Sequence, residues 1–234
     1  MSRVPGGVGG RSPLTKTVTL REGARLVLIT LHRREGWDSP GPGAGTVGGG
    51  GRSPTVMDGV MTAIRDAARA HPGVDFVYPV HLNPNVRGPA HEILGSVSNV
   101  QLVEPIAYIP FVQLLARSTV IVTDSGGIQE EAPSLAVPVL VLRRTTERPE
   151  GLGANNRLIG TDPERIRLEL DRVLAGAPTI RPELPAPSPF GDGRASARIQ
   201  QAILSFFGQA EPPEEFGDPS ELARLRAKPA TVLE

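Results

Sequence analysis

Short apolar runs recur along most of the chain, and polar stretches separate them. The runs are rich in valine, isoleucine and leucine, which is typical of strands buried on both faces of a parallel sheet. On this pattern we predict strands at residues 25–31, 76–80, 100–103, 120–123, 139–142 and 157–159.

Apolar residues at helical spacing fill several of the intervals between these runs. The clearest series starts at Met57, with Ser53-Pro54 predicted as its N-cap and first turn, and ends at His71-Pro72-Gly73. Further helices are predicted at 89–94, 111–117, 128–135, 165–174 and 195–207. Strands that alternate with helices indicate an α/β fold with a doubly wound, mainly parallel sheet.

Glycine and proline are concentrated near the N-terminus and after Trp37. Such stretches are typical of flexible segments. We therefore predict a flexible segment over 1–24, and an α/β domain over 25–207 with a Gly/Pro-rich loop insertion at 36–54. A loose polar tail is predicted over 208–234.

Composition narrows the function classes. The 25 basic and 25 acidic residues cancel, so we expect no general nucleic-acid or membrane binder. The absence of cysteine excludes disulfides and thiolate metal sites, and the four histidines lack metal-ligand spacing. No apolar run is long enough to span a membrane and no secretion signal is evident, so we expect a cytoplasmic protein without a metal.

Polar clusters follow three of the predicted strands directly. They are His32-Arg33-Arg34, His81 and Asp124-Ser125-Gly126-Gly127. In parallel α/β sheets ligands bind beyond the carboxyl ends of the strands. We therefore expect the functional site at this edge.

The Ser-Gly-Gly turn combines features of an anion site. Gly126 and Gly127 allow close backbone approach and φ > 0, the next helix contributes its positive end, and Ser125 offers a hydroxyl. Glu130 and Glu131 suit a helix start, but an acid can also accept hydrogen bonds from a ribose. A nucleoside diphosphate would explain both features. The alternative is a glycine-rich turn whose acids serve only the helix dipole.

Four other residues each have two interpretations. Arg148 can pair with a phosphate through its fork of N–H groups, or lie solvated at the surface. His32 and His81 can titrate near neutral pH or donate to an anionic oxygen, or be structural. Phe111 can stack on a flat base or pack in the core.

Several longer stretches carry a resemblance to a known family. TLHRRE at 30–35, YPVHLNPNV at 78–86, TDSGGIQEEAPSL at 123–135 and TTERPEG at 145–151 occur in the family's order. VEPIAYIPF and GDGRAS are also similar. Together these stretches resemble the C-terminal half of non-hydrolysing UDP-N-acetylglucosamine 2-epimerases, over roughly residues 25–207.

The resemblance implies a Rossmann-like C-terminal domain of a two-domain glycosyltransferase-B-type fold, with the active site between the domains. It implies reversible conversion of UDP-N-acetylglucosamine (UDP-GlcNAc) to UDP-N-acetylmannosamine (UDP-ManNAc), without a cofactor. UDP leaves from the sugar as a base takes the proton at C2, and returns after reprotonation on the other face. The ligands would be UDP-GlcNAc, UDP-ManNAc and UDP.

The same resemblance implies roles for the turn and its neighbours. Ser125, Gly126 and Gly127 would hold the diphosphate. Glu131 would bind the ribose hydroxyls, while Glu130 keeps its place at the helix start. Arg148 would lie in the same nucleotide pocket.

Four further residues receive roles by resemblance. Phe111 and the Ile106 backbone would border the uracil. His32 would lie at the diphosphate and the reacting sugar as the catalytic residue. His81 would belong to a second, regulatory substrate site.

Two departures from the family change the functional expectation. We find no match to the family's N-terminal domain, with its glycine–threonine–arginine–proline motif and proton-moving carboxylates, and the loop at 36–54 adjoins His32. We therefore expect the chain alone to have weak or no epimerase activity, and expect as partner a separate N-terminal half or a second copy. The alternatives are a non-catalytic UDP-sugar-binding module and a hydrolysing relative that releases UDP and ManNAc.

Overall fold

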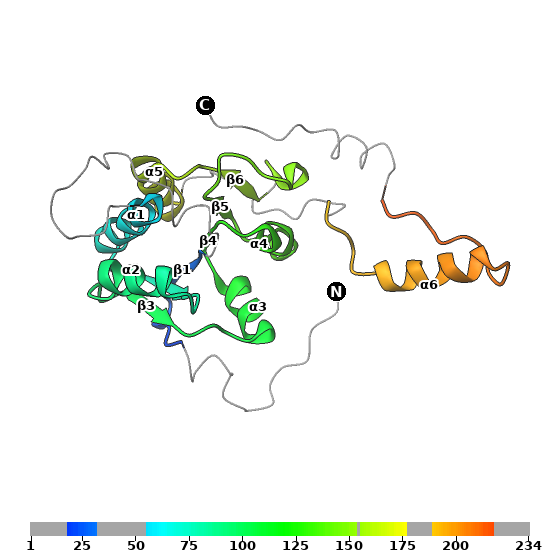
Figure 1. Cartoon of the computed structure of the whole chain (residues 1–234), viewed down its shortest axis with the longest axis horizontal. Helices are drawn as coiled ribbons and strands as arrows, with labels where there is room; N and C mark the ends of the chain where they lie inside the picture. The colour runs from blue at the N-terminus through cyan, green and yellow to red at the C-terminus, as the bar shows by residue number, and fades with distance from the viewer. Residues whose placement is uncertain (1–17, 32–54, 154, 177–188, 218–234) are drawn as a thin grey trace.

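The computed structural model describes residues 18–31, 55–153, 155–176 and 189–217, so the predicted loop at 36–54 lies outside the described residues. Six parallel strands form one sheet in the order β3-β2-β1-β4-β5-β6 (Figure 1). They are β1 (Arg25–Thr30), β2 (Val74–Pro79), β3 (Val100–Val103), β4 (Val120–Thr123), β5 (Val139–Val141) and β6 (Asn156–Leu158). All six overlap the predicted strands, and the α/β fold class is confirmed.

The strand order reverses between β1 and β4. The first strand, β1, lies in the middle of the sheet. From there the chain moves outward through β2 to β3, crosses back to β4 and continues outward to β6. Thr30 pairs with Thr123 at the carboxyl ends of β1 and β4, and the Thr30 hydroxyl donates to that of Thr123 at 2.6 Å. In doubly wound sheets ligands bind at such a reversal, beyond the strand ends.

Three helices cover one face of the sheet. These are α1 (Val56–Ala70), α2 (Pro84–Leu94) and α5 (Pro163–Leu174), grouped together in Figure 1. Their apolar stripes pack on alternate sheet residues such as Val27 and Ile29. This alternation follows from the strand period of two.

The opposite face is covered by shorter elements. These are α3 (Tyr108–Arg117), α4 (Gly126–Glu131) and the 3₁₀ turn η3 (Ala132–Leu135). They pack on the other set of β1 residues, Leu26 and Leu28. The sheet is therefore buried on both faces, which explains why its strands are continuous apolar runs rather than alternating ones.

The prediction of Ser53-Pro54 as the start of the first long helix was wrong. The N-cap of α1 is Thr55, whose hydroxyl accepts from the Asp58 amide at 3.2 Å. The Asp58 carboxylate in turn accepts from the Thr55 amide at 2.7 Å. This reciprocal pair satisfies two backbone donors at the helix start, and a cap at Ser53 could not form it, because Val56, three residues later, has no side-chain acceptor.

Four further helices begin earlier than predicted, and α2 and α3 differ most. α2 begins at Pro84 after the N-cap Asn83, whose side chain accepts from the Asn85 amide, and Pro89 lies inside it. α3 begins at Tyr108, so Pro110 lies in its first turn. Proline lacks only a donor that the first helical turn leaves unpaired anyway. The two predicted helices began at Pro89 and directly after Pro110, and the structure places both prolines inside the helices.

The ends of the predicted α/β domain differ in their contacts. Val18 is buried, and the Arg21 guanidinium contacts the carboxylate of Asp75 at 2.6 Å, so residues 18–24 lie against the sheet. The last helix, α6 (Ala195–Phe206), buries none of its residues and lies apart from the sheet in Figure 1. The domain limits at 25 and 207 stay predictions.

Candidate functional site

The turn after β4 lies beside the reversal in strand order. The Ser125 backbone amide donates to the Thr123 hydroxyl at 2.9 Å, and that hydroxyl also accepts from Thr30. The turn is thus tied to the ends of both central strands. Ser125 is the N-cap of α4, but its side chain makes no capping hydrogen bond.

The two glycines of the turn do not use the left-handed backbone that glycine allows. Neither Gly126 nor Gly127 has positive φ. Gly126 is needed for space instead, because a Cβ there would lie 2.8 Å from both Cζ and Nη1 of Arg148. At Gly127 the nearest atom to an added Cβ would be 3.8 Å away, and the residue is exposed. α4 has only six residues, so the turn's amides matter more than a helix dipole.

Arg148 reaches this turn from the segment after β5. It is the N-cap of the 3₁₀ turn η4 (Pro149–Gly151), and its guanidinium lies against Gly126. Its Nε donates to Oε1 of Glu130 at 2.6 Å, and Nη1 lies 3.3 Å from Oε2 of Glu147. The sequence placed Arg148 in the same pocket as the turn, and the structure brings the two together. The expected place of Glu130 at the helix start was wrong, because Glu130 lies near the end of the six-residue α4, where it pairs with Arg148 instead.

A buried polar network lies behind the turn. Gln129 is fully buried and Thr146 is 2% exposed, and the Thr146 hydroxyl donates to Oε1 of Gln129 at 2.6 Å. The Gln129 side-chain amide donates to the Ser125 carbonyl at 3.0 Å. No motif in the sequence reveals this network, because it joins residues that follow two different strands.

Glu131 offers an acceptor at the same place. Its Oε2 is buried without a hydrogen-bond partner among the described residues. Its Oε1 lies beside Gly127, 3.8 Å from where a Cβ would be. A buried carboxylate oxygen without a donor costs free energy, so ligand hydroxyls would be stabilised here.

The two residues assigned to the uracil lie on the α3 side of the sheet. Ile106 and Phe111 are both half-buried and pack against the core on that face. α3 itself packs against η3, which continues α4. Phe111 is therefore at least partly a core residue, and a stacking role for its exposed part stays a prediction.

The structure describes only one of the two histidines that the sequence analysis singled out. His81 is exposed after β2, and its Nδ1 accepts from the Asn83 amide at 3.2 Å. β1 separates β2 from β4, so His81 and the Ser125 turn follow strands that are not neighbours. His32 lies outside the described residues, and its predicted role stays untested.

Tyr78 supports the end of β1, and sequence reasoning did not single it out. This buried β2 residue donates its hydroxyl to the Leu31 carbonyl at 3.1 Å. Burial raises the pKa of the phenol well above its usual range, and the negative charge of nearby Asp124 raises it further. The hydroxyl therefore stays a donor at neutral pH.

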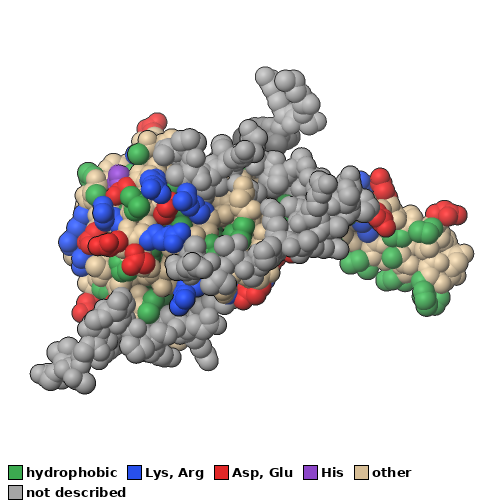
Figure 2. Space-filling model, turned by 90° about the horizontal axis from the view of Figure 1, so that it is seen from above, with side chains coloured by type: hydrophobic (Ala, Val, Ile, Leu, Met, Phe, Trp, Pro, Cys, Tyr) green, Lys and Arg blue, Asp and Glu red, His purple; other side chains and the backbone are tan. Residues whose placement is uncertain are grey.

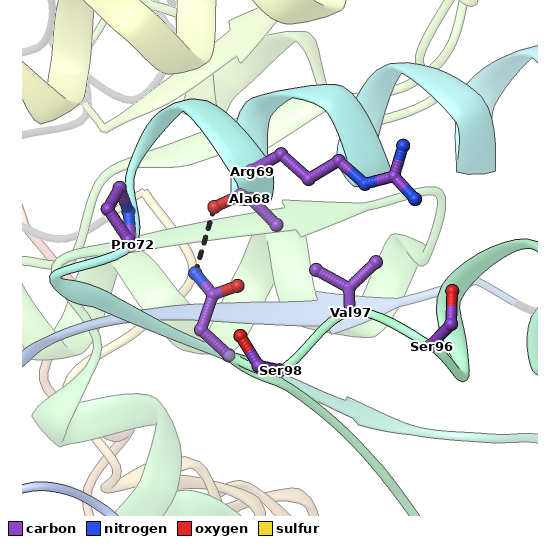
Figure 3. A pocket seen from close by; sticks show the side chains of 7 residues that line it. Ala68, Arg69, Pro72, Ser96, Val97 and Ser98 are labelled. Carbon is purple, nitrogen blue, oxygen red and sulfur yellow. Dashed lines mark hydrogen bonds between the residues drawn. The ribbon is translucent and has the colours of Figure 1, made fainter.

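A cavity at the other end of the sheet does not belong to this cluster. It lies between the end of α1 and the segment before β3, and is lined in part by Arg69, Pro72 and Ser96 (Figure 3). Asn99 there donates to the Ala68 carbonyl at 2.9 Å, and also to the carbonyls of His71 and Val74. The Asn99 side chain caps the end of α1 and so has a structural role.

The described part of the chain gives two negative findings. Within it, no three histidine, aspartate or glutamate residues are grouped so that they could hold a metal ion. None of its helices combines the length and apolarity needed to cross a membrane.

Figure 2 shows basic and acidic side chains side by side on one face of the main body, with apolar side chains on the segment that carries α6.

Comparison with known sequences places these features in a family context. The chain matches the family profile described as UDP-N-acetylglucosamine 2-epimerase over residues 10–204. It is 46% identical over 188 residues to the UDP-N-acetylglucosamine 2-epimerase of Salmonella typhimurium, covering 80% of this chain and 46% of that one. The Escherichia coli K12 enzyme is 46% identical over 180 residues, covering 76% and 44%. The chain spans about half the length of the curated relatives it matches.

Solved structures agree with the sequence matches. UDP-GlcNAc 2-epimerase of Neisseria meningitidis, bound to UDP-GlcNAc, is similar with a TM-score of 0.64 and 38% identity over 80% of this chain and 46% of that one. The Methanocaldococcus jannaschii enzyme, in complex with UDP-GlcNAc and UDP, has a TM-score of 0.60 at 26% identity, covering 78% and 46%. Both likenesses extend over most of the chain described above.

Proposed function

Because this chain belongs to the UDP-N-acetylglucosamine 2-epimerase family, we propose that it supplies the UDP-binding half of an enzyme that interconverts UDP-GlcNAc and UDP-ManNAc. One observation carries the proposal more than any other. Arg148 lies against Gly126 from a different strand connection, while a donor-less oxygen of Glu131 is buried beside the same turn. A cation, open backbone amides and a free acceptor together match a nucleoside diphosphate.

The diphosphate would bind between the turn and Arg148. The amides of Gly126 and Gly127 and the Ser125 hydroxyl would donate to its oxygens, and the Arg148 guanidinium would supply positive charge. UDP gains negative charge as it leaves the sugar, so donors held in place before the reaction stabilise the transition state more than mobile water does. The ties from Thr123 and Gln129 to the turn support such a fixed arrangement.

The nucleoside would extend away from the diphosphate site between the turn and Arg148. Glu131 would accept hydrogen bonds from the ribose hydroxyls, which gives its buried Oε2 the donors it lacks among the described residues. The uracil would lie by the Ile106 backbone and the exposed part of Phe111. Both residues occupy the α3 side of the sheet, the same face as α4.

The proton steps would need groups beyond the nucleotide clamp. We assign His32 to the diphosphate and the reacting sugar, and His81 to a second, regulatory site. The remaining acids and bases would come from a companion domain, since the chain spans about half the length of its curated relatives. We therefore propose weak or no turnover by the chain alone, because proton abstraction beside a poor acid needs a positioned base.

The companion that supplies these groups would be a separate N-terminal half, and a second copy of this chain is the other partner that we propose. The exposure of α6 supports a docking role, because none of its residues is buried and Ile199, Ile203 and Phe206 are 60%, 53% and 84% exposed. We further propose that the enzyme works in the cytoplasm and serves polysaccharide biosynthesis.

Incubation with UDP-GlcNAc tests the proposal, with and without an added N-terminal half from a relative. We expect UDP-ManNAc to form at an appreciable rate only when both halves are present. Appreciable UDP-ManNAc from the chain alone would contradict the proposed dependence on a companion. Free UDP and ManNAc as products would favour the hydrolysing alternative, and UDP binding without turnover in the presence of the companion would favour a binding module.

A further inference from the structure

We propose that Gln129 and Thr146 are positioning residues, which hold the Ser125 turn and Arg148 at a fixed separation suited to a nucleoside diphosphate. The inference rests on the proposed function and goes beyond it, because neither side chain would touch the nucleotide. It gives a function to a buried network that packing alone does not require.

Three consecutive hydrogen bonds connect the Ser125 turn to Arg148. The Gln129 side-chain amide donates to the Ser125 backbone carbonyl at 3.0 Å, and the Thr146 hydroxyl donates to the side-chain Oε1 of Gln129 at 2.6 Å. The Arg148 backbone amide then donates to the Thr146 hydroxyl at 3.1 Å. These bonds therefore run from the turn proposed to bind the diphosphate to Arg148, whose guanidinium is the proposed cation.

The sheet does not provide this connection by itself. β4 and β5 are in register up to Thr123 and Val141, but the turn after β4 and the segment after β5 continue past the ladder. The Gln129 backbone carbonyl accepts from the Asn156 side-chain amide at 2.8 Å, which ties Gln129 to β6. Gln129 therefore links the segments after β4 and β5 to the first residue of β6.

Burial makes the link stiff. Gln129 is fully buried and Thr146 is 2% exposed, so water cannot readily replace their partners. Hydrogen bonds in such surroundings are stronger than at the surface, and loss of one partner leaves the other unsatisfied. Binding groups held in place in advance lose less conformational entropy when the ligand arrives.

Thr146→Val tests the inference, because it keeps the branched shape and removes the hydroxyl. We expect the Kd for UDP to rise about fivefold to tenfold, the loss typical of one hydrogen bond. The Kd for uridine, which lacks phosphate, should stay unchanged. Thr146→Ser retains the hydroxyl and should restore most of the UDP affinity.

Two controls separate positioning from general destabilisation. Thr119→Val removes a hydroxyl that accepts from the Leu26 amide at the other end of β4, and should leave UDP binding unchanged. In an Arg148→Ala background, Thr146→Val should have no further effect on UDP binding if it acts through Arg148. The Arg148 amide should exchange with solvent faster in Thr146→Val than in the wild type, with or without nucleotide.

Each outcome has a distinct meaning. Equal UDP affinity of the wild type and a folded Thr146→Val variant overturns the inference alone, as does an undiminished effect in the Arg148→Ala background. An equal loss for UDP and uridine also overturns it, because that result marks a structural role. No UDP binding by the wild type overturns the proposed function and this inference together.

Discussion

Replacement of Gly126 by alanine tests whether the observed place of Arg148 matters for binding. The added Cβ would lie 2.8 Å from Cζ and Nη1 of Arg148, whereas ordinary contacts begin at 3.4 Å. The guanidinium must therefore move away from the turn. It is the free end of a flexible side chain that is 31% exposed, so it can do so without moving the backbone.

The cost to stability should be small. The displaced ion pair with Glu130 is substantially exposed, and such pairs contribute about 0–1 kcal/mol. Alanine is favoured over glycine in a helix by up to about 1 kcal/mol, which offsets that loss. We expect the free energy of unfolding in urea to change by less than about 1 kcal/mol.

The cost to binding should be much larger. A hydrogen bond to a charged group contributes about 1.5–3 kcal/mol, so displacement of Arg148 should raise the Kd for UDP about tenfold to a hundredfold. Calorimetric titration of Gly126→Ala and Arg148→Ala measures this directly. Gly88→Ala in α2 is the matched control, because nothing lies within 4 Å of its added Cβ.

A double variant separates displacement of Arg148 from direct blockage of the ligand. If Gly126→Ala acts through Arg148, the double variant Gly126→Ala/Arg148→Ala should bind UDP no more weakly than Arg148→Ala. A further loss would mean that the methyl group meets the nucleotide itself. Wild-type affinity in Gly126→Ala would refute the reasoning, since the guanidinium cannot keep its place beside the added methyl group.

Two other predictions concern single buried groups. Glu131→Gln removes the charge of a carboxylate whose Oε2 lacks a donor among the described residues, so the melting temperature should not fall. The wild type should bind UDP more tightly than 2′-deoxy-UDP. Retention of that preference by the variant would argue against ribose recognition by Glu131. The pKa of Tyr78 is raised on folding, so its stabilising contribution is complete below the ordinary value of 10.0 and is lost as pH rises above it. In urea titrations above that pH, the free energy of unfolding of the wild type should fall by about 1.4 kcal/mol more per pH unit than that of Tyr78→Phe. Tyr108→Phe replaces an exposed tyrosine and should behave like the wild type. Equal slopes for the wild type and Tyr78→Phe would count against the raised pKa.

The strands could be predicted from the sequence because burial on both faces of the sheet requires short runs of mostly apolar residues. In Val120–Thr123 the first three residues are apolar and all four are buried, and the polar clusters that follow such runs mark the carboxyl edge of the sheet. The starts of α2 and α3 were harder to predict. There the prolines at 84 and 110 lie in the first helical turn, where the missing N–H costs nothing.

The candidate site was predictable only in part. Ser125, Gly126 and Arg148 were identified from local chemistry and resemblance, and the structure brings them together. The reason for glycine at 126 was not predictable, because the close contact comes from a residue after another strand. The link through Gln129 and Thr146 was missed for the same reason, since its hydrogen bonds join segments that are distant in sequence.

Calorimetric titration of UDP into the wild-type chain, Glu131→Ala and Arg148→Ala tests the central claim most directly. The account predicts saturable binding to the wild type and weaker binding to each variant, because each substitution removes one side of the proposed pocket. Absence of binding to the wild type, or binding that neither substitution weakens, would contradict the claim that this chain forms the UDP site.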